Sequence, residues 1–286
     1  MAEISAKDVA ALRKVTGAGM MDCKKALEET GGDLDLAKDW LREKGIAGAA
    51  KRAGRDADQG AVEVRVEGGT GAIVELNCET DFVAKGDVFK DAVGKLSALV
   101  LAEGADDVLA KSIDGESVDD FVKGLSGKLG EKIELGRIVR FDTRDGLLDA
   151  YKHIQNERGT IAVLVELGGV KVDDAKAREV AHDIALHIAN RSTAPRYVTR
   201  DEFPADVVAR EREIFEKQTR EEGKPEQAWP KIIEGKLNGF FKGEGGALLD
   251  QAFVKDNKQT ISALLAQSLG ADAQVRRFAR VEIGQD

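Results

Sequence analysis

The spacing of apolar residues first changes from the helical to the strand period near residue 60, and that change indicates the fold class. Before it, residues 1 to 50 carry apolar side chains at helical spacing. After it, Val62, Val64 and Val66 alternate with charged residues, as in a half-exposed β-strand. A glycine-rich turn then leads to a second apolar strand, and helical and strand patterns follow one another to the end. We therefore predict an α+β fold with antiparallel sheets.

The first part of the chain, residues 1–55, is predicted to be a separate N-terminal module of three short helices. Ser5 and Asp33 suit the caps of the first and third helices, because their side-chain oxygens can accept hydrogen bonds from free backbone amides. Residues 16–19 separate the first helix from the second. A short basic, glycine-broken link, residues 51–55, is expected to join the module to the rest of the chain.

The second of these helices carries a pair of adjacent methionines. We expect Met20, Cys23 and Leu27 to share its inner face. Neighbours on a helix point about 100° apart, so Met20 and Met21 do not both face one core, and at least one should lie near the surface. A flexible thioether suits a surface that binds a partner.

A strand–helix pattern occurs twice after residue 56, which predicts a core of two similar subdomains. The matching pairs of segments are 71–76 with 160–167, the helix after residue 85 with 174–190, and 137–141 with 276–281. We expect the first subdomain to cover residues 56–142, and the second to combine 143–202 with 244–286. Residues 203–243 interrupt the second subdomain, and two apolar helical patterns around a Gly-Lys-Pro turn predict an inserted antiparallel helical hairpin.

Composition limits the kind of partner. A formal charge of −9 argues against a dominant nucleic-acid surface, because phosphate binding needs clustered Lys and Arg, so a protein partner fits better. The two cysteines, Cys23 and Cys78, are far apart and indicate neither a disulfide framework nor a zinc site, which favours a cytoplasmic location. No signal pattern or membrane-length apolar run is present in the sequence.

Catalytic chemistry is not indicated either. His182 and His187 lie five residues apart on one predicted helix, on different faces, and no metal-ligand spacing occurs. A thiol at Cys78 that leaves an apolar strand beside Glu79 should have a raised pKa, which suits no nucleophile. We therefore expect no catalytic residue, no metal and no cofactor.

The most informative stretch is residues 77–85, at the junction of an apolar strand and a helix. Asn77, Thr80 and Asp81 suit a turn, because their side chains can bond the local backbone. The turn leaves Phe82 near its tip beside a carboxylate. Two interpretations are open from chemistry alone: Phe82 is an exposed probe, or it staples the start of the helix onto the sheet.

Two long motifs separate these interpretations. Residues 12–27, LRKVTGAGMMDCKKAL, and residues 77–85, NCETDFVAK, resemble the signatures of bacterial elongation factor Ts, in the same order. The family is the guanine-nucleotide exchange factor for elongation factor Tu. The resemblance covers nearly the whole chain, including the segments 151–153 and 184–189, and departs at Gly86, where the family carries Asn or Asp.

The resemblance implies roles for particular residues. Thr80, Asp81, Phe82 and Val83 become the exchange probe, which enters the GTPase domain of elongation factor Tu near its magnesium and phosphates. Phe82 is then a wedge, and Asp81 disturbs the environment of the metal by its charge.

The resemblance also implies contacts elsewhere. The N-terminal module becomes a ubiquitin-associated-like domain that docks on the partner through Arg13, Met20 and Met21. Tyr151 and His153 become a second contact on a more distal partner domain, with packing at a strand as the alternative. The helical hairpin becomes a possible homodimer contact. Neither direct nucleic-acid binding nor membrane binding is implied.

Two other classes of function are kept as alternatives. In the first, the protein is a ubiquitin-associated-type adaptor that binds a partner through residues 1–50 without exchange. In the second, it is an enzyme built on Cys78. The rate of GDP release from elongation factor Tu distinguishes all three.

Overall fold

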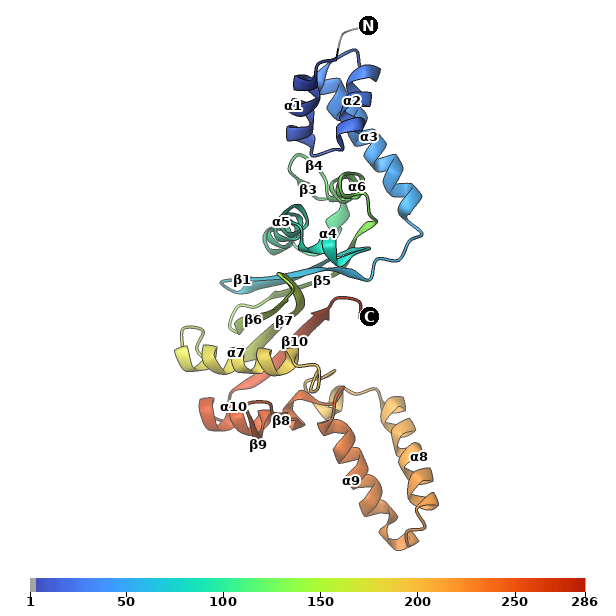
Figure 1. Ribbon diagram of the computed structural model, residues 1–286. Coiled ribbons are helices and arrows are strands. Elements are labelled where there is room, and N and C mark those ends of the chain that lie inside the picture. The colour runs from blue at the N-terminus through green and yellow to red at the C-terminus, as the bar shows by residue number, and fades with distance from the viewer. Residues whose placement is uncertain (1–3, 286) are drawn as a thin grey trace.

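The computed structural model describes residues 4–285, apart from the side chains of Ile46 and Ala47, and shows a mixed α+β protein (Figure 1). Its α-helices are α1 (Ala6–Thr16), α2 (Met20–Glu29), α3 (Leu34–Arg52), α4 (Asp81–Lys85), α5 (Asp87–Glu103), α6 (Val118–Leu129), α7 (Ala175–Ala189), α8 (Ala205–Glu221), α9 (Trp229–Lys242) and α10 (Ile261–Leu269). Its strands are β1 (Gln59–Glu67), β2 (Thr70–Cys78), β3 (Ser112–Ile113), β4 (Glu116–Ser117), β5 (Ile133–Asp142), β6 (Leu147–Gln155), β7 (Arg158–Gly168), β8 (Ala252–Phe253), β9 (Asp256–Thr260) and β10 (Gln274–Glu282). Short 3₁₀ turns are η1 (Val108–Ala110), η2 (Arg200–Glu202), η3 (Glu226–Ala228) and η4 (Leu248–Asp250). The α+β class predicted from the change of apolar spacing is confirmed.

Helices α1–α3 form a small bundle whose ends follow local capping rules. The Ser5 hydroxyl accepts from the Asp8 amide at 3.1 Å, which caps α1. Asp33 caps α3 in the same way by accepting from the Asp35 amide at 2.9 Å. Gly17 ends α1 in the left-handed region, at φ 67°, where a residue with a Cβ is strained. Both predicted caps are confirmed.

Two expectations about this bundle are wrong. Met20 does not line the core, because it is the first residue of α2 and side chains tilt toward the helix N-terminus, past the end of the bundle. Cys23, Ala26 and Leu27 form the buried face instead. The basic link also begins later than expected, since α3 continues to Arg52.

Helix α3 is long enough to leave the bundle and pack on α6 (Figure 1). The two backbones meet at glycines: a Cβ built on Gly127 lies 2.6 Å from the Cα of Gly45. Arg42 adds an ion pair to Glu116 at 3.2 Å and another to Asp120 at 3.4 Å. The N-terminal bundle is therefore held against α6 by direct helix contact.

Two three-stranded antiparallel sheets follow, with the orders β1-β2-β5 and β10-β7-β6. Each is assembled in the same way, from a β-hairpin, a helix, a small second hairpin, another helix and a final strand. The first set is β1-β2, α5, β3-β4, α6 and β5, and the second is β6-β7, α7, β8-β9, α10 and β10. In the second set α8 and α9 stand between α7 and β8.

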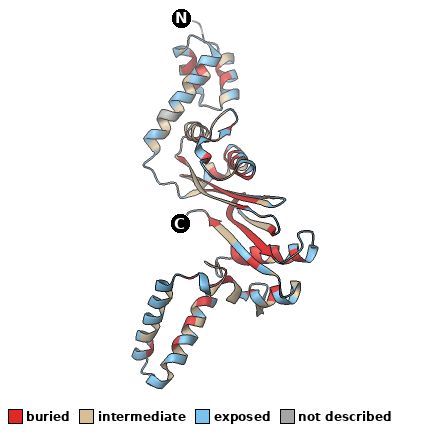
Figure 2. Cartoon of the chain, turned by 180° about the vertical axis from the view of Figure 1, so that it is seen from behind, coloured by how far each residue is buried: buried red, intermediate tan, exposed pale blue. Residues whose placement is uncertain are grey.

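The two sheets pack face to face and make the centre of the molecule. The apolar side chains between them are Val62, Ile73, Phe141, Leu148, Ala162, Leu164 and Val281. Helices α5 and α6 cover the outer face of the first sheet, and α7 and α10 cover that of the second. Buried residues are concentrated in these four layers (Figure 2). Strand β7 is buried along its whole length, as expected for the middle strand of a covered sheet.

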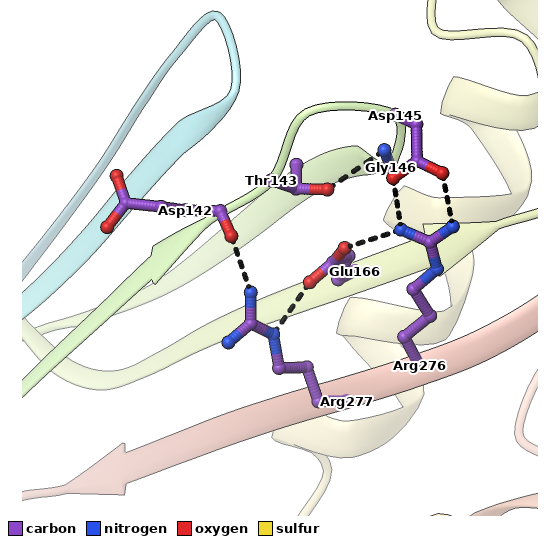
Figure 3. A network of polar contacts seen from close by, with 7 residues as sticks. All are labelled: Asp142, Thr143, Asp145, Gly146, Glu166, Arg276 and Arg277. Atoms are coloured by element: carbon purple, nitrogen blue, oxygen red, sulfur yellow. Dashed lines mark hydrogen bonds and ion pairs between the residues drawn. The ribbon is translucent and has the colours of Figure 1, made fainter.

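A polar network ties the connection between the sheets, residues 142–146, to strand β10 (Figure 3). The Glu166 carboxylate, which is 4 % exposed, accepts from Arg277 Nε at 2.6 Å and from Arg276 Nη1 at 3.1 Å. Arg276 also binds the Asp145 carboxylate at 2.7 and 2.9 Å. Arg277 continues into the first sheet, because its guanidinium lies 4.2 Å from the centre of the Phe141 ring.

These contacts also fix the ionisation of the network. Burial by itself raises the pKa of the Glu166 carboxyl, but Thr143 and the two arginines outweigh burial and hold that pKa below its ordinary value. The Arg276 guanidinium likewise lowers the pKa of Asp145. The network is therefore ionised at neutral pH and connects both sheets to the chain between them.

Helices α8 and α9 form an antiparallel hairpin that projects from the second sheet's side of the molecule (Figure 1). Ile233, Leu237 and Phe241 of α9 make its apolar core, against which Val208 and Phe215 of α8 pack. Two further apolar residues of α8, Val207 and Ile214, are 36 % and 39 % exposed. They lie seven residues apart, and thus on one side of the helix.

The sequence patterns missed three hairpin pieces. For strand β6 we expected only that Tyr151 and His153 could pack at a strand end, and its bounds and partner were not predicted. The short pairs β3-β4 and β8-β9 have only two to five residues per strand, too few to show a period. Strand β6 and the two short strand pairs are identified from their hydrogen-bonded pairing in the structure, and not from a period in the sequence.

The glycine contact between α3 and α6 gives a test of how the N-terminal bundle is held. Gly127→Ala should lower unfolding stability by about 1–3 kcal/mol, because its Cβ must displace the backbone at Gly45. Gly124→Ala on the same helix should be neutral or up to about 1 kcal/mol stabilising, because no atom lies within 4 Å. Urea unfolding followed by Trp40 fluorescence in a Trp229→Phe background measures both. Equal midpoints for the two variants would contradict the contact.

Candidate functional site

Helix α4 is a single short helix that connects β2 to α5 and carries the most exposed large apolar side chain in the described chain. Phe82 is 82 % exposed, whereas its neighbours Val83 and Ala84 pack on the core between the first sheet and the helices α5 and α6. The interpretation of Phe82 as a staple is therefore wrong. The ring points away from the protein and adds almost nothing to the folded core.

The turn before α4 is clamped by a carboxylate from elsewhere in the chain. Glu131 accepts from the Thr80 amide at 2.9 Å and from the Thr80 hydroxyl at 2.5 Å. One residue earlier, the Glu79 carboxylate accepts from the Lys132 amide at 2.6 Å and pairs with Arg55 at 3.1 Å. Both clamps join α4 to the start of β5, so the tip sits on a rigid base.

The local cap of α4 differs from the expectation. Thr80 accepts from the Val83 amide at 3.4 Å, as predicted for a turn residue. Asn77, however, lies within β2, paired with Gly60 and Glu134, so it is not part of the turn. Gly86, where the sequence departs from the family pattern, ends α4 and begins α5 with extended backbone. Residues 81–85, which were expected in a turn, thus form a short helix of their own, and the expected helix after residue 85 is α5.

The tip carries a charge pair as well as a ring. Lys85 Nζ donates to Asp81 Oδ2 at 2.5 Å and lies 5.7 Å from the centre of the Phe82 ring. The hydrogen bond from Lys85 lowers the pKa of Asp81, so the carboxylate is ionised at neutral pH. Sequence analysis missed the roles of Lys85, Glu79 and Glu131. The one available signal was the spacing of four residues between Asp81 and Lys85.

The other predicted contact residues lie on separate elements. Arg13 is exposed on α1, and Met20 and Met21 are 57 % and 73 % exposed at the start of α2. Val15 on α1 is also exposed, at 68 %. The bundle stands beyond α6, whereas α4 lies over the first sheet (Figure 1). The structure therefore presents the N-terminal residues and the probe as two surfaces.

Tyr151 and His153 do come together, on one face of β6. The Tyr151 hydroxyl lies 3.2 Å from His153 Nδ1, and the ring of His182 on α7 meets Tyr151 edge-on at 6.0 Å between centroids. His182 in turn bonds Asp149, with 3.0 Å between Nδ1 and Oδ2. Burial raises the pKa of Asp149, although the nearby His182 opposes that rise. The pair is half-buried, so it packs on the sheet and still presents an edge to solvent.

The remaining titratable groups have structural surroundings. His187 is fully buried, bonds Gln251 at 3.0 Å, and has a pKa lowered by burial. Burial also raises the pKa of the Cys78 thiol to about 12, and Glu131 adds to that rise. Cys78 is therefore a protonated thiol that donates to the Thr80 carbonyl at 3.1 Å, and not a nucleophile.

Within residues 4–285, no group of three or more His, Cys, Asp or Glu side chains is placed to hold a metal ion. No helix of this part of the chain is long and apolar enough to cross a membrane.

An exposed ring beside an ionised carboxylate, on a helix clamped at its base, defines a protein-binding factor that acts by contact. Comparison with known proteins agrees. The family model "Elongation factor TS" matches residues 79–285. The chain is 47 % identical to elongation factor Ts of Thermobifida fusca over 290 residues, and 47 % identical to that of Saccharopolyspora erythraea, with 100 % of both chains covered in each case. It is 42 % identical to that of Prosthecochloris aestuarii, covering 99 % of this chain and 100 % of the relative.

The chain belongs to the elongation factor Ts family, the nucleotide exchange factors for elongation factor Tu in translation elongation. An exchange factor makes and breaks no covalent bond, so the protein is not an enzyme. The interpretations as an adaptor or as an enzyme built on Cys78 are therefore set aside. Translation elongation is a cytoplasmic process, in line with the expectation from the cysteines.

The raised pKa of Cys78 predicts how the thiol reacts with alkylating reagents. With a pKa near 12, the thiol stays protonated at pH 8, and only the thiolate reacts. Iodoacetamide should modify Cys78 in the folded protein at least about a hundredfold more slowly than a cysteine introduced as Phe82→Cys. Peptide mass spectrometry at pH 8 measures both rates. Similar rates at the two positions would show that Cys78 is neither buried nor protonated.

Proposed function

We propose that the protein accelerates GDP release by inserting the tip of α4 into the GTPase domain of elongation factor Tu, near the magnesium ion and the phosphates. The exposure of Phe82 is the observation that supports this proposal most strongly. A phenylalanine that leaves most of its ring in water gains little from folding, and a rigid apolar ring is a typical anchor in a protein interface. The clamped base keeps the tip from folding back.

Each residue of the probe has a distinct part in this proposal. Phe82 is the wedge that displaces the partner's switch region. Asp81 brings a carboxylate toward the magnesium site, where its charge competes for the metal environment. Thr80 and Val83 hold the probe in place, since Thr80 caps α4 and bonds Glu131 while Val83 packs on the core.

Docking is assigned to surfaces away from the probe. Arg13, Met20 and Met21 would bind the GTPase domain through a ubiquitin-associated-like module, residues 1–55. Tyr151 and His153 would rest on a more distal domain of the partner. Both sets of residues have exposed edges, and they lie on different elements. This arrangement supports binding to the partner at several points, with the probe between them.

The effect on nucleotide must be a coupling free energy between two binding events. Whatever factor the protein imposes on the affinity of elongation factor Tu for GDP, GDP imposes on the affinity for the protein. The complex that contains all three is therefore a short-lived intermediate.

The arrangement of the chain supports a division into the units expected from its sequence. The repeated topology fits subdomains at 56–142 and at 143–202 with 244–286, and residues 203–243 are the inserted hairpin. The exposed residues Val207 and Ile214 give this hairpin an apolar stripe that fits self-association with a second copy.

The Phe82→Ala variant tests the probe. Truncation should leave the free energy of unfolding within about 0.5 kcal/mol of wild type, because the ring is exposed. The rate of GDP release at saturating protein should fall by about tenfold or more, the loss typical of an interface hot spot. Asp81→Asn should have a smaller effect, because a partly solvated carboxylate is screened. Both variants should be measured at several magnesium concentrations.

Leu109→Ala is the matched control, since Leu109 is another large apolar residue of the same subdomain and is 50 % exposed. It should change neither stability nor release. If Phe82→Ala melts several kcal/mol early while its folded fraction releases GDP at the normal rate, the wedge proposal is wrong.

A further inference from the structure

Lys85 contacts both the carboxylate and the aromatic ring of the probe. Its ammonium group binds the Asp81 carboxylate at 2.5 Å and stands over the Phe82 ring, 5.7 Å from the ring centre. Asp81 and Lys85 are 37 % and 31 % exposed, so the pair lies at the surface and not in the core. The contact therefore does little for the fold and acts on the tip itself.

The geometry favours this arrangement in the free protein. An acidic residue four positions before a lysine is the favourable orientation of a helical ion pair. Helix α4 has only five residues, too short to be stable alone, so side-chain contacts matter for its shape. An exposed phenylalanine otherwise moves among rotamers within nanoseconds, and a cation over its face restricts that motion.

Among the described residues, one other cation, Arg158, acts on Asp81. Arg158 is 8 % exposed, and its Nη2 donates to Gln59 Oε1 at 2.8 Å. It lies at the start of β7 and acts on Asp81 by its charge, whereas Lys85 also donates a hydrogen bond to Asp81. Within the described residues, Lys85 is the cation that moves with the tip.

We propose that Lys85 is a positioning residue of exchange: it holds the Asp81 carboxylate and the Phe82 ring in the orientation in which they enter the partner. This inference rests on the proposed function of the probe. It also means that, in the free protein, the Asp81 carboxylate is held by Lys85 before it meets the partner. Loss of Lys85 should therefore slow nucleotide release without weakening the docking surfaces, which lie on other elements.

The test is GDP release from elongation factor Tu, measured over a range of concentrations of the full-length protein. Lys85→Met removes the charge and keeps the length and helix preference of the side chain. It should lower the plateau rate by about two- to fivefold and leave the half-saturating concentration within about twofold. Lys85→Arg, which keeps a cation, should recover most of the rate. Thermal melting should match wild type, and Lys85→Gln serves in its place if Lys85→Met melts early.

The chain offers a matched control on another helix. Lys123 binds Asp119 on α6 with the same four-residue spacing, the same 2.5 Å distance and similar exposure. Lys123→Met removes an equivalent surface ion pair away from the tip and should leave the plateau unchanged. A general effect of lost charge would slow both variants alike and would overturn the proposal.

A double variant separates positioning from direct contact with the partner. If Lys85 acts through Asp81 and Phe82, adding Lys85→Met to Asp81→Asn should slow release by less than about twofold further. If the double variant slows release by the product of the two single-variant factors, Lys85 contacts the partner independently of Asp81, and the proposal is overturned. A wild-type plateau for Lys85→Met, alongside a slow Phe82→Ala, would overturn this inference alone. Normal GDP release by both Lys85→Met and Phe82→Ala would overturn the proposed function as well.

Discussion

The contact between the two β-sheets is the interaction on which the rest of the structure depends. Each sheet has one face against a pair of helices and the other against its partner sheet, so neither covers its apolar surface alone. The network of Glu166, Arg276 and Arg277 adds polar contacts across residues 142–146, which connect the two sheets. Because packed interfaces resist continuous deformation, the probe on one half and Tyr151 on the other stay at a fixed separation.

The candidate site on α4 depends on the rigidity of the packed sheets. The tip of α4 gains nothing from burial, and its base is instead held by carboxylates of Glu79 and Glu131 that reach the start of β5. These part-buried hydrogen bonds have an ionised acceptor, which makes them stronger than bonds between neutral groups, so they hold the base of α4 in place. The tip therefore has a firm base and a solvent-exposed end, and the proposed insertion into the partner needs both properties.

The sequence predicts the fold class, the N-terminal helix caps and the inert state of Cys78, because each depends on local pattern or on the chemistry of one group. It misplaced Met20 and Asn77, whose surroundings depend on where a helix begins and which strand pairs with which. The Glu131 clamp joins residues 51 positions apart, and no period in the sequence reports it. The proposed role of Phe82 as a probe comes from the family motif, since chemistry alone left its burial open.

The central claim is that docking and nucleotide release are carried by separate surfaces joined by a rigid core. Met21→Ala tests it most directly, because Met21 is 73 % exposed, so its truncation should cost the fold little. GDP release from elongation factor Tu should be followed as the concentration of wild type or variant is raised. The account predicts the wild-type plateau, reached at a half-saturating concentration about threefold or more higher. A reduced plateau at an unchanged half-saturating concentration would contradict it.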